Sequence, residues 1–241
     1  MEIGKSLGDS MEYAKEAVWG KWVKWILLVI SSIIFPLIIG YMMEIYRGKT
    51  PAPELEHWGK LFIDGIKLIV AGIIYAIPII IIAVLVIGAP IFAMMSNPSP
   101  EVVVGLFGAM AIGIIILIIL SFIIGLIWYI GMIRMARTDR FGEAFNISAI
   151  MAKIRAIGWG NYIIALIVLW VVMVVISFVI MIIAAIPFIG WLIYLFLLPV
   201  VTIFSARYMT LLYESAGEPA ATPAGQPPVV PAEQPPAVPA E

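Results

Sequence analysis

Cysteine is absent from this chain of 241 residues, and histidine occurs once, at His57. A chain without thiols has no disulfide, no thiolate nucleophile and no cysteine-ligated metal, and one imidazole does not complete a typical zinc site. The sequence also lacks the Gly-x-Ser-x-Gly, phosphate-loop, dinucleotide-binding and His-Glu-x-x-His patterns. These absences predict a protein that is not an enzyme and that uses no cofactor or metal.

Charge is missing over long stretches. No Asp, Glu, Lys or Arg occurs from Ala156 to Ala206, which is more than twice the roughly 20 residues that span a bilayer as a helix. Leu68 to Pro100 and Val102 to Ile133 are also uncharged. Hydrophobic residues make up 63% of the chain, against about 45–50% in soluble domains. The sequence therefore predicts an integral membrane protein of the all-α class, a polytopic transmembrane helical bundle.

The hydropathy pattern divides the chain into a short N-terminal helix, a transmembrane domain over residues 22–213 and a tail. Five hydrophobic segments are predicted, at about residues 22–46, 68–95, 102–136, 161–185 and 188–213. Pro78 is expected to kink the second of them, because proline removes a backbone donor. Three amphipathic helices are predicted at the membrane interface, over residues 1–21, 54–67 and 141–157.

The N-terminal helix places apolar residues three or four positions apart, which predicts one lipid-facing stripe made of Ile3, Leu7, Met11, Ala14 and Val18. Trp19, Trp22 and Trp25 follow, and tryptophan is typical of the headgroup level.

Two topologies are open for residues 22–46. An ordinary single span is the default, and it puts the N-terminal lysines opposite the later basic loops. If the segment instead turns at Pro36 as a re-entrant hairpin, all Lys and Arg lie on one face, as the positive-inside tendency favours. In both topologies we expect the basic loops 47–67 and 134–155 on the cytoplasmic side of a cell membrane.

The tail, residues 214–241, is rich in Pro, Ala and Glu and nearly repeats one octad. Such a composition predicts a disordered, extended spacer. A docking site for a proline-binding partner is the alternative.

Candidate binding residues follow from the charge pattern. Membrane lipids are the expected partner, and nucleic acid is not expected. The candidate contacts with lipid headgroups are Lys60, Lys67, Arg134, Arg137, Arg140, Lys153 and Arg155. A stripe of small residues at multiples of four predicts close helix packing, within the chain or between copies in a homo-oligomer, through Gly105, Ala109, Gly113, Ser121 and Gly125.

His57 lies near Glu54, Glu56 and Asp64, so an acid–base or carboxylate-rich metal cluster is conceivable there. Lys60 and Lys67 share the segment, and an interfacial helix of mixed charge explains it better.

The hydrophobic segments from Leu68 onward contain no ionisable residue inside their uncharged runs, which argues against an ion-coupled carrier. A path for neutral solutes stays open, because hydroxyl groups could line one, at Tyr75, Ser121, Tyr129, Ser177, Tyr194, Thr202 and Ser205. Such hydroxyls more often bond backbone carbonyls.

Several positions together resemble a known membrane family: Pro36, Gly40-Tyr41, Arg47, Pro53-Glu54, Trp58, Leu61-Phe62-x-Asp64-Gly65-x-Lys67, Tyr75 and Pro78. The family is the one catalogued as domain of unknown function 4013, and the likeness covers about Trp19 to Tyr213. The resemblance implies an archaeal membrane protein, with a broader similarity to membrane domains attached to some glycerophosphodiester phosphodiesterases. The family has no established activity, so it implies no catalytic residues.

Two functional hypotheses follow. The first is a non-enzymatic lipid-interacting or scaffolding module, which the amphipathic helices and the missing catalytic motifs favour. The alternative is a transporter or exporter of small neutral or amphiphilic solutes, motivated by Pro78, Pro187 and Pro199 and by a weak threefold repeat of the segments. Another membrane protein as a partner is compatible with either hypothesis.

Overall fold

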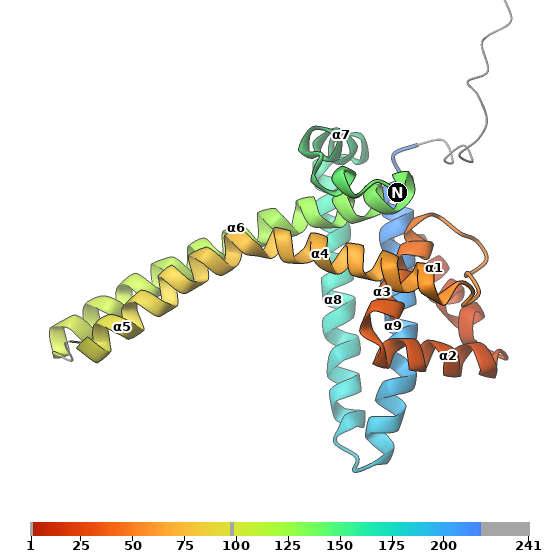
Figure 1. Ribbon diagram of the computed structural model, residues 1–241, viewed down its shortest axis with the longest axis horizontal. Helices are drawn as coiled ribbons and strands as arrows, with labels where there is room; N and C mark the ends of the chain where they lie inside the picture. Colours follow the sequence, from red (N-terminus) through yellow and green to blue (C-terminus); the bar gives the residue numbers. More distant parts are fainter. Residues whose placement is uncertain (1, 97–98, 218–241) are drawn as a thin grey trace, which may run out of the picture.

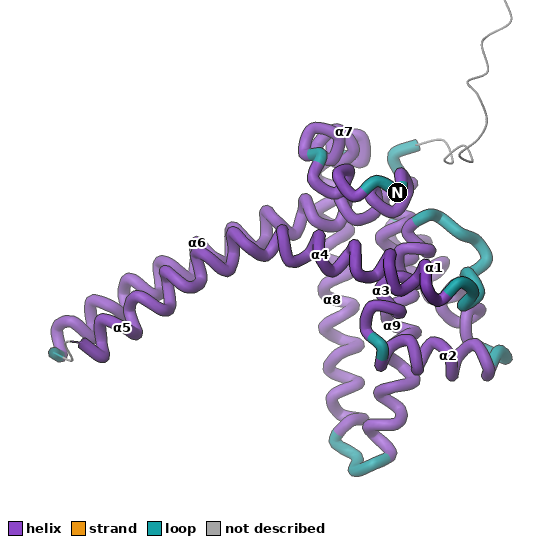
Figure 2. Tube along the Cα trace, viewed as in Figure 1, coloured by secondary structure: helices purple, strands orange, loops and turns teal. Residues whose placement is uncertain are grey.

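The computed structural model describes residues 2–96 and 99–217, and every regular element in these ranges is helical (Figures 1 and 2). Among the described residues, four helices are long and apolar enough to cross a membrane: Trp58–Ser96, Val103–Thr138, Trp159–Ala184 and Ile189–Glu214. A bent pair of shorter helices brings the number of candidate spans to five if it counts as one. The predicted class, an all-α polytopic membrane protein, is confirmed.

The first hairpin consists of α4 (Trp58–Ala83), the π-helical stretch η1 (Val84–Gly88), α5 (Ala89–Ser96) and α6 (Pro100–Thr138). The helix from Trp58 to Ser96 is continuous, so the amphipathic helix predicted at 54–67 is not a separate element but the start of the span. It begins no earlier because His57 has a φ of 54° in the left-handed region. Pro78 lies inside α4 without ending it, and the π-helical stretch follows.

The second hairpin consists of α8 (Trp159–Ala184) and α9 (Ile189–Glu214), which agree with the predicted segments 161–185 and 188–213. Gly190 allows the tight return, because a Cβ there would overlap the carbonyl of Ile183. The two hairpins diverge from a common base at one end of the molecule (Figure 1). Their apolar flanks are therefore largely uncovered by protein.

Residues 22–46 form two helices, α2 (Trp22–Ile33) and α3 (Phe35–Tyr46), bent by 120° relative to each other. Pro36 occupies the first turn of α3, where its missing N–H breaks no helical bond. Each helix has 12 residues, about 18 Å at 1.5 Å per residue, and is too short to span about 30 Å of hydrocarbon alone. The segment is a broken span or a re-entrant hairpin, and not a straight span.

The predicted N-terminal helix is present as α1 (Ile3–Val18), and two residues of its predicted apolar stripe, Ala14 and Val18, are buried by protein. Met11 is 51% exposed, whereas the buried residues are Ser6, Ser10, Tyr13, Ala14, Ala17 and Val18. Small side chains let α1 pack closely on α9, and the buried Ser10 hydroxyl is satisfied because it donates to the Ser6 carbonyl at 2.6 Å. Contact with α9 therefore determines which side chains of α1 are buried.

The amphipathic stretch predicted at 141–157 consists of two pieces, the 3-10 helix η2 (Phe141–Phe145) and α7 (Ile147–Ile157). Asn146 separates them because its side chain accepts a hydrogen bond from the Ala149 N–H at 3.2 Å and so caps α7.

Large buried side chains gather where the helices meet at the base of the hairpins. Four tyrosines are fully buried there, Tyr41, Tyr162, Tyr208 and Tyr213. Of the predicted disordered tail, residues 214–241, the first residue, Glu214, ends α9, and residues 218–241 lie outside the described part of the chain.

Candidate functional site

A cluster of charged side chains joins the C-terminal end of α3 to the start of α4. Glu44 and Asp64 are both buried, and Arg47 lies between them. The Arg47 guanidinium is 2.5 Å from Glu44 Oε1 and 2.7 Å from Asp64 Oδ2, and it reaches Asp139 Oδ1 at 3.2 Å. One arginine thus connects α3, α4 and the end of α6.

Three lysines surround the same two carboxylates. The Lys49 ammonium lies 2.5 Å from Glu44 Oε2, and that of Lys60 lies 2.9 Å from Glu44 Oε1. Lys67 lies 3.3 Å from Asp64 Oδ1. We call the seven residues the charged cluster: Glu44, Arg47, Lys49, Lys60, Asp64, Lys67 and Asp139. Lys60 and Lys67, two of the expected lipid contacts, are engaged by carboxylates of the protein itself.

Two glycines bring α3 and α4 close enough for this cluster to form. A Cβ at Gly40 would overlap the backbone of Leu61, and a Cβ at Gly65 would overlap the carbonyl of Pro36. The helices therefore cross in backbone contact. Nothing in the sequence alone predicts this crossing, although both glycines lie in the strings that resemble the family.

Arg134, Arg137 and Lys153 have partners in the fold as well. Arg137 lies 2.5 Å from Glu214 and donates to the Tyr46 carbonyl at 3.1 Å. Lys153 is buried, with its ammonium 4.3 Å from the centre of the Tyr213 ring.

Arg134 lies 2.6 Å from Glu143, and the hydrogen bond from this guanidinium lowers the pKa of the Glu143 carboxyl, which is also held by Asn146. Of the seven candidate lipid contacts, Arg140 and Arg155 have exposed side chains and no ion pair to a described residue. Whether any of the seven touches lipid stays a prediction.

The small-residue stripe on α6 is only partly used inside the chain. A Cβ at Gly113 would collide with Val86 of η1, so the helices pack closely at this position. Gly105 and Gly125 have no heavy atom within 4 Å of a Cβ built on them, Ala109 is exposed and Ser121 is half-buried. Helix packing within the chain therefore explains the small residue at Gly113, one of the five positions of the stripe.

The residues considered for an acid–base cluster have different partners. Glu54 pairs with Lys24 at 3.0 Å, and Asp64 belongs to the charged cluster. His57 and Glu54 line a cavity of about 260 Å³ that Asp64 does not line. Within residues 2–96 and 99–217, no group of three His, Asp or Glu side chains could hold a metal ion.

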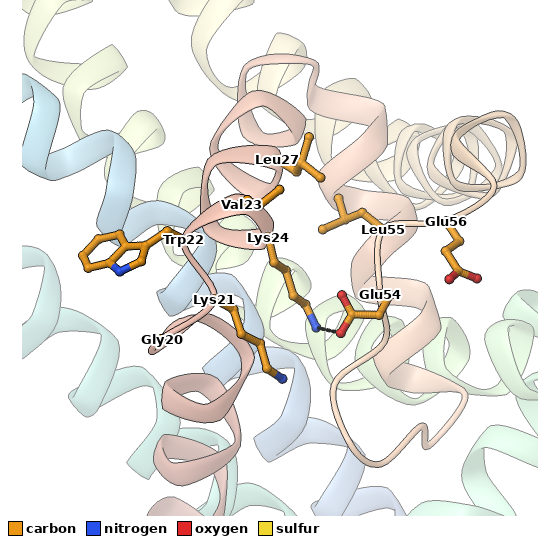
Figure 3. Close-up of a pocket in the computed structure, with 9 residues that line it drawn as sticks. All are labelled: Gly20, Lys21, Trp22, Val23, Lys24, Leu27, Glu54, Leu55 and Glu56. Carbon is orange, nitrogen blue, oxygen red and sulfur yellow. Dashed lines mark hydrogen bonds and ion pairs between the residues drawn. The ribbon is translucent and has the colours of Figure 1, made fainter.

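Another cleft, of about 600 Å³, lies between the start of α2 and the loop before α4 (Figure 3). We call it the α2 cleft, and its lining is Gly20, Lys21, Trp22, Val23, Lys24, Leu27, Glu54, Leu55 and Glu56. Lys24 is 5% exposed, and its ammonium lies 3.0 Å from both Glu54 Oε1 and the Ala52 carbonyl. Figure 3 shows the Lys21 side chain at the other side of the cleft from Glu56. The cleft combines amines, carboxylates and an apolar wall.

A cleft of about 500 Å³ lies in the second hairpin and is lined by Ser177, Ile180, Met181, Ala184, Trp191, Tyr194, Leu198, Val201 and Thr202. It brings together three of the hydroxyl residues considered for a solute path. Thr202 donates to the Leu198 carbonyl at 2.9 Å, and elsewhere Tyr75 donates to the Ala144 carbonyl at 2.6 Å. Bonding to backbone carbonyls is thus the role of several of these hydroxyls.

The N-terminal helix shares its polar contacts with the first basic loop. The Tyr13 hydroxyl donates to the Lys49 carbonyl at 2.9 Å, and the Arg207 guanidinium lies 4.9 Å from the centre of the Tyr13 ring. Burial raises the pKa of Tyr13 to about 12, against a smaller opposing effect of Arg207, so the hydroxyl stays a donor at neutral pH. α1 and the loop after α3 therefore lie at the same end of the molecule.

Together the fold and its clefts define a polytopic helical membrane protein with a charged base. The model of the family described as "Protein of unknown function (DUF4013)" matches residues 25–185, the greater part of the chain, and the chain belongs to that family. No curated protein and no solved structure matches the chain. The match runs from within α2 to the end of α8, so α1 and α9 lie outside it.

Proposed function

We propose that this protein is a non-enzymatic module of the cell membrane that binds phospholipids, with its basic loops 47–67 and 134–155 on the cytoplasmic side. The observation that carries the proposal is the α2 cleft, where exposed Lys21 adjoins the apolar residues Trp22, Val23 and Leu27. A phospholipid has the same two parts, an anionic headgroup and apolar chains, so one cleft can hold both.

The arrangement of the hairpins supports lipid contact over transport. Protein buries only a small share of the hydrophobic window of each candidate span: 6% for Trp58–Ser96, 11% for Val103–Thr138, 6% for Trp159–Ala184 and 28% for Ile189–Glu214. A path for a solute must be enclosed by several helices, whereas these two hairpins diverge (Figure 1). In a bilayer, lipid would cover the open flanks.

Lipid retention tests the proposal directly. The full chain would be purified from nanodiscs containing equal amounts of phosphatidylglycerol and phosphatidylcholine, and the lipids that remain bound would be counted by native mass spectrometry. We expect the anionic lipid to be retained at least several-fold more often. Equal retention of both lipids, or retention of neither, would contradict the proposal.

A transporter of neutral or amphiphilic solutes is the second candidate, favoured by the cleft that contains Ser177, Tyr194 and Thr202. Its test is glycerol flux into proteoliposomes, compared between the wild type and the double variant Ser177→Ala/Thr202→Val. A flux that requires the protein and falls in the variant would support transport. A flux equal to that of empty liposomes would exclude glycerol as the solute.

The resemblance described above also motivates an archaeal source and a kinship with the membrane domains of phosphodiesterases, which we retain as hypotheses. A structure of such a phosphodiesterase membrane domain tests the second one. Its helices should reproduce the close crossing at Gly40 and Gly65, and a domain without this crossing would speak against the kinship.

A further inference from the structure

We propose that the α2 cleft is a specific site for an anionic phospholipid, in which Lys21 and Lys24 contact the phosphate and Glu54 limits the affinity. This inference rests on the proposed function and deepens it, because it assigns the ligand class to particular residues. The cleft, rather than the dispersed basic residues of the loops, would then be the place where the headgroup is recognised.

The cationic side of the cleft has capacity left for a ligand. Lys21 is exposed and forms no ion pair with a described residue. The Lys24 ammonium has three donors, and two partners are present, Glu54 Oε1 and the Ala52 carbonyl. The Lys21 ammonium is therefore available for phosphate oxygens, which form strong charge-assisted hydrogen bonds, and the buried Lys24 ammonium keeps one donor beyond its two partners.

The apolar side of the cleft continues directly from these amines. Val23 is 75% exposed and Trp22 is 64% exposed, while Leu55 is buried in the wall. Trp22 is held in place by stacking on Trp25, with ring centres 5.5 Å apart. Covering Val23 and Trp22 with hydrocarbon is favourable by about 25 cal/mol per Å². A soluble phosphate ester would leave this surface uncovered, so the occupant is a lipid.

Glu54 sets how strongly the site attracts the phosphate. Its side chain is 58% exposed, unlike the buried Lys24 side chain with which it pairs. A phosphate that approaches Lys24 meets the negative charge of Glu54 at the same amine. Neutralising Glu54 should therefore strengthen the binding of an anionic headgroup, whereas removing the Lys21 charge should weaken it.

The experiment measures binding of a fluorescent phosphatidylglycerol to the full chain in nanodiscs made of phosphatidylcholine. We expect Lys21→Gln to weaken the binding about tenfold, Val23→Asn to weaken it about threefold and Glu54→Gln to strengthen it about threefold. Lys5→Gln is the matched control, because Lys5 is an exposed lysine on α1, outside the cleft, and this variant should bind as the wild type does.

Further measurements make each outcome decisive. Lys21 and Val23 are exposed, so their variants should keep the thermal unfolding midpoint of the wild type, which is measured alongside. Unchanged binding in Lys21→Gln, or weaker binding in Glu54→Gln with an unchanged midpoint, would overturn the cleft assignment. If the wild type still retains anionic lipid in that case, the proposed function stands and only this inference fails.

A soluble competitor identifies the source of the phosphate. Glycerol 3-phosphate at the concentration of the lipid should displace almost none of it. If glycerol 3-phosphate displaced the lipid as well as an equal concentration of unlabelled phosphatidylglycerol would, the cleft would bind any phosphate. This result would overturn the assignment to lipid.

Discussion

The base of the molecule and its two hairpins contrast in how they are held together. At the base, Arg47 joins two buried carboxylates and the backbones of α3 and α4 touch at Gly40 and Gly65. Away from the base, the helices of the hairpins carry long uncharged stretches with little protein contact, and only 6% of the hydrophobic window of Trp58–Ser96 is buried. Specific polar and backbone contacts thus concentrate at one end.

The contrast has a physical reason. In lipid, apolar helices gain little by packing on one another, because the hydrocarbon around them is equally apolar. Ion pairs and close backbone contact must therefore fix the angle between the hairpins. Changes at the base should alter the whole fold, whereas changes on the flanks of the hairpins should be tolerated.

The largest expected effect is an all-or-none difference in labelling across the membrane. The chain has no cysteine, so Met11→Cys, Ser96→Cys and Arg140→Cys each introduce one thiol, all at exposed positions. Because Tyr13 bonds to the loop at Lys49 and Arg47 pairs with Asp139, we expect positions 11 and 140 to react with an impermeant maleimide from the same side. Position 96, at the tip of the first hairpin, should react from the opposite side. Opposite labelling of positions 11 and 140 would instead establish that residues 22–46 cross the membrane.

Removing Arg47 should be the most destabilising of the substitutions. Arg47→Ala leaves Glu44 and Asp64 buried with less charge compensation, which we expect to cost about 3 kcal/mol of unfolding free energy. Thermal unfolding in detergent measures the loss. Arg155→Ala, at an exposed arginine on α7, is the matched control and should change stability by less than about 0.5 kcal/mol. Equal effects of the two variants would show that the charged cluster does not hold the base.

A methyl group at the helix crossing should have the next largest effect. Gly40→Ala forces α3 away from Leu61 and should cost about 2 kcal/mol, measured by the same unfolding experiment. Gly105→Ala on α6 meets no atom within 4 Å and should be neutral or slightly stabilising, because alanine favours a helix. A stable Gly40→Ala variant would contradict the close crossing.

The fold could be predicted in outline because it depends on local composition. The uncharged runs predicted the long helices of both hairpins, and the spacing of apolar residues predicted the helix α1. The buried face of α1 could not be predicted, since it depends on contact with α9, a helix distant in the sequence.

The charged cluster was partly visible in the sequence. Glu44 and Arg47 are three residues apart on α3, and Asp64 lies between Lys60 and Lys67 at helical spacing. What the sequence did not contain was the crossing that brings these two sets together. The lipid-contact prediction for Lys60 and Lys67 counted their charges but not the buried carboxylates of α3 and α4.

The smallest expected effect is a pH dependence at η2. The hydrogen bond from Arg134 lowers the pKa of Glu143 in the folded protein, so the contact stabilises the fold above the carboxyl's unfolded pKa. Its contribution is lost as the pH falls through the folded pKa. The unfolding midpoint of the wild type should therefore drop by about one degree more between pH 7 and pH 3 than that of Glu143→Gln. An equal drop of the midpoint in the wild type and in Glu143→Gln would mean that the pair of Arg134 and Glu143 contributes nothing to stability.

The contact between α1 and α9 bears on how this family should be divided for laboratory work. A fragment cut to the matched residues 25–185 would lack α9, the hairpin partner of α8, and both residues of the contact between Tyr13 and Arg207. It would also lose the carbonyl of Phe196, to which Trp25 donates a hydrogen bond at 2.9 Å. The stretch that these contacts join is therefore longer than the stretch that the family model matches, and a fragment made for laboratory work should include α1 through α9.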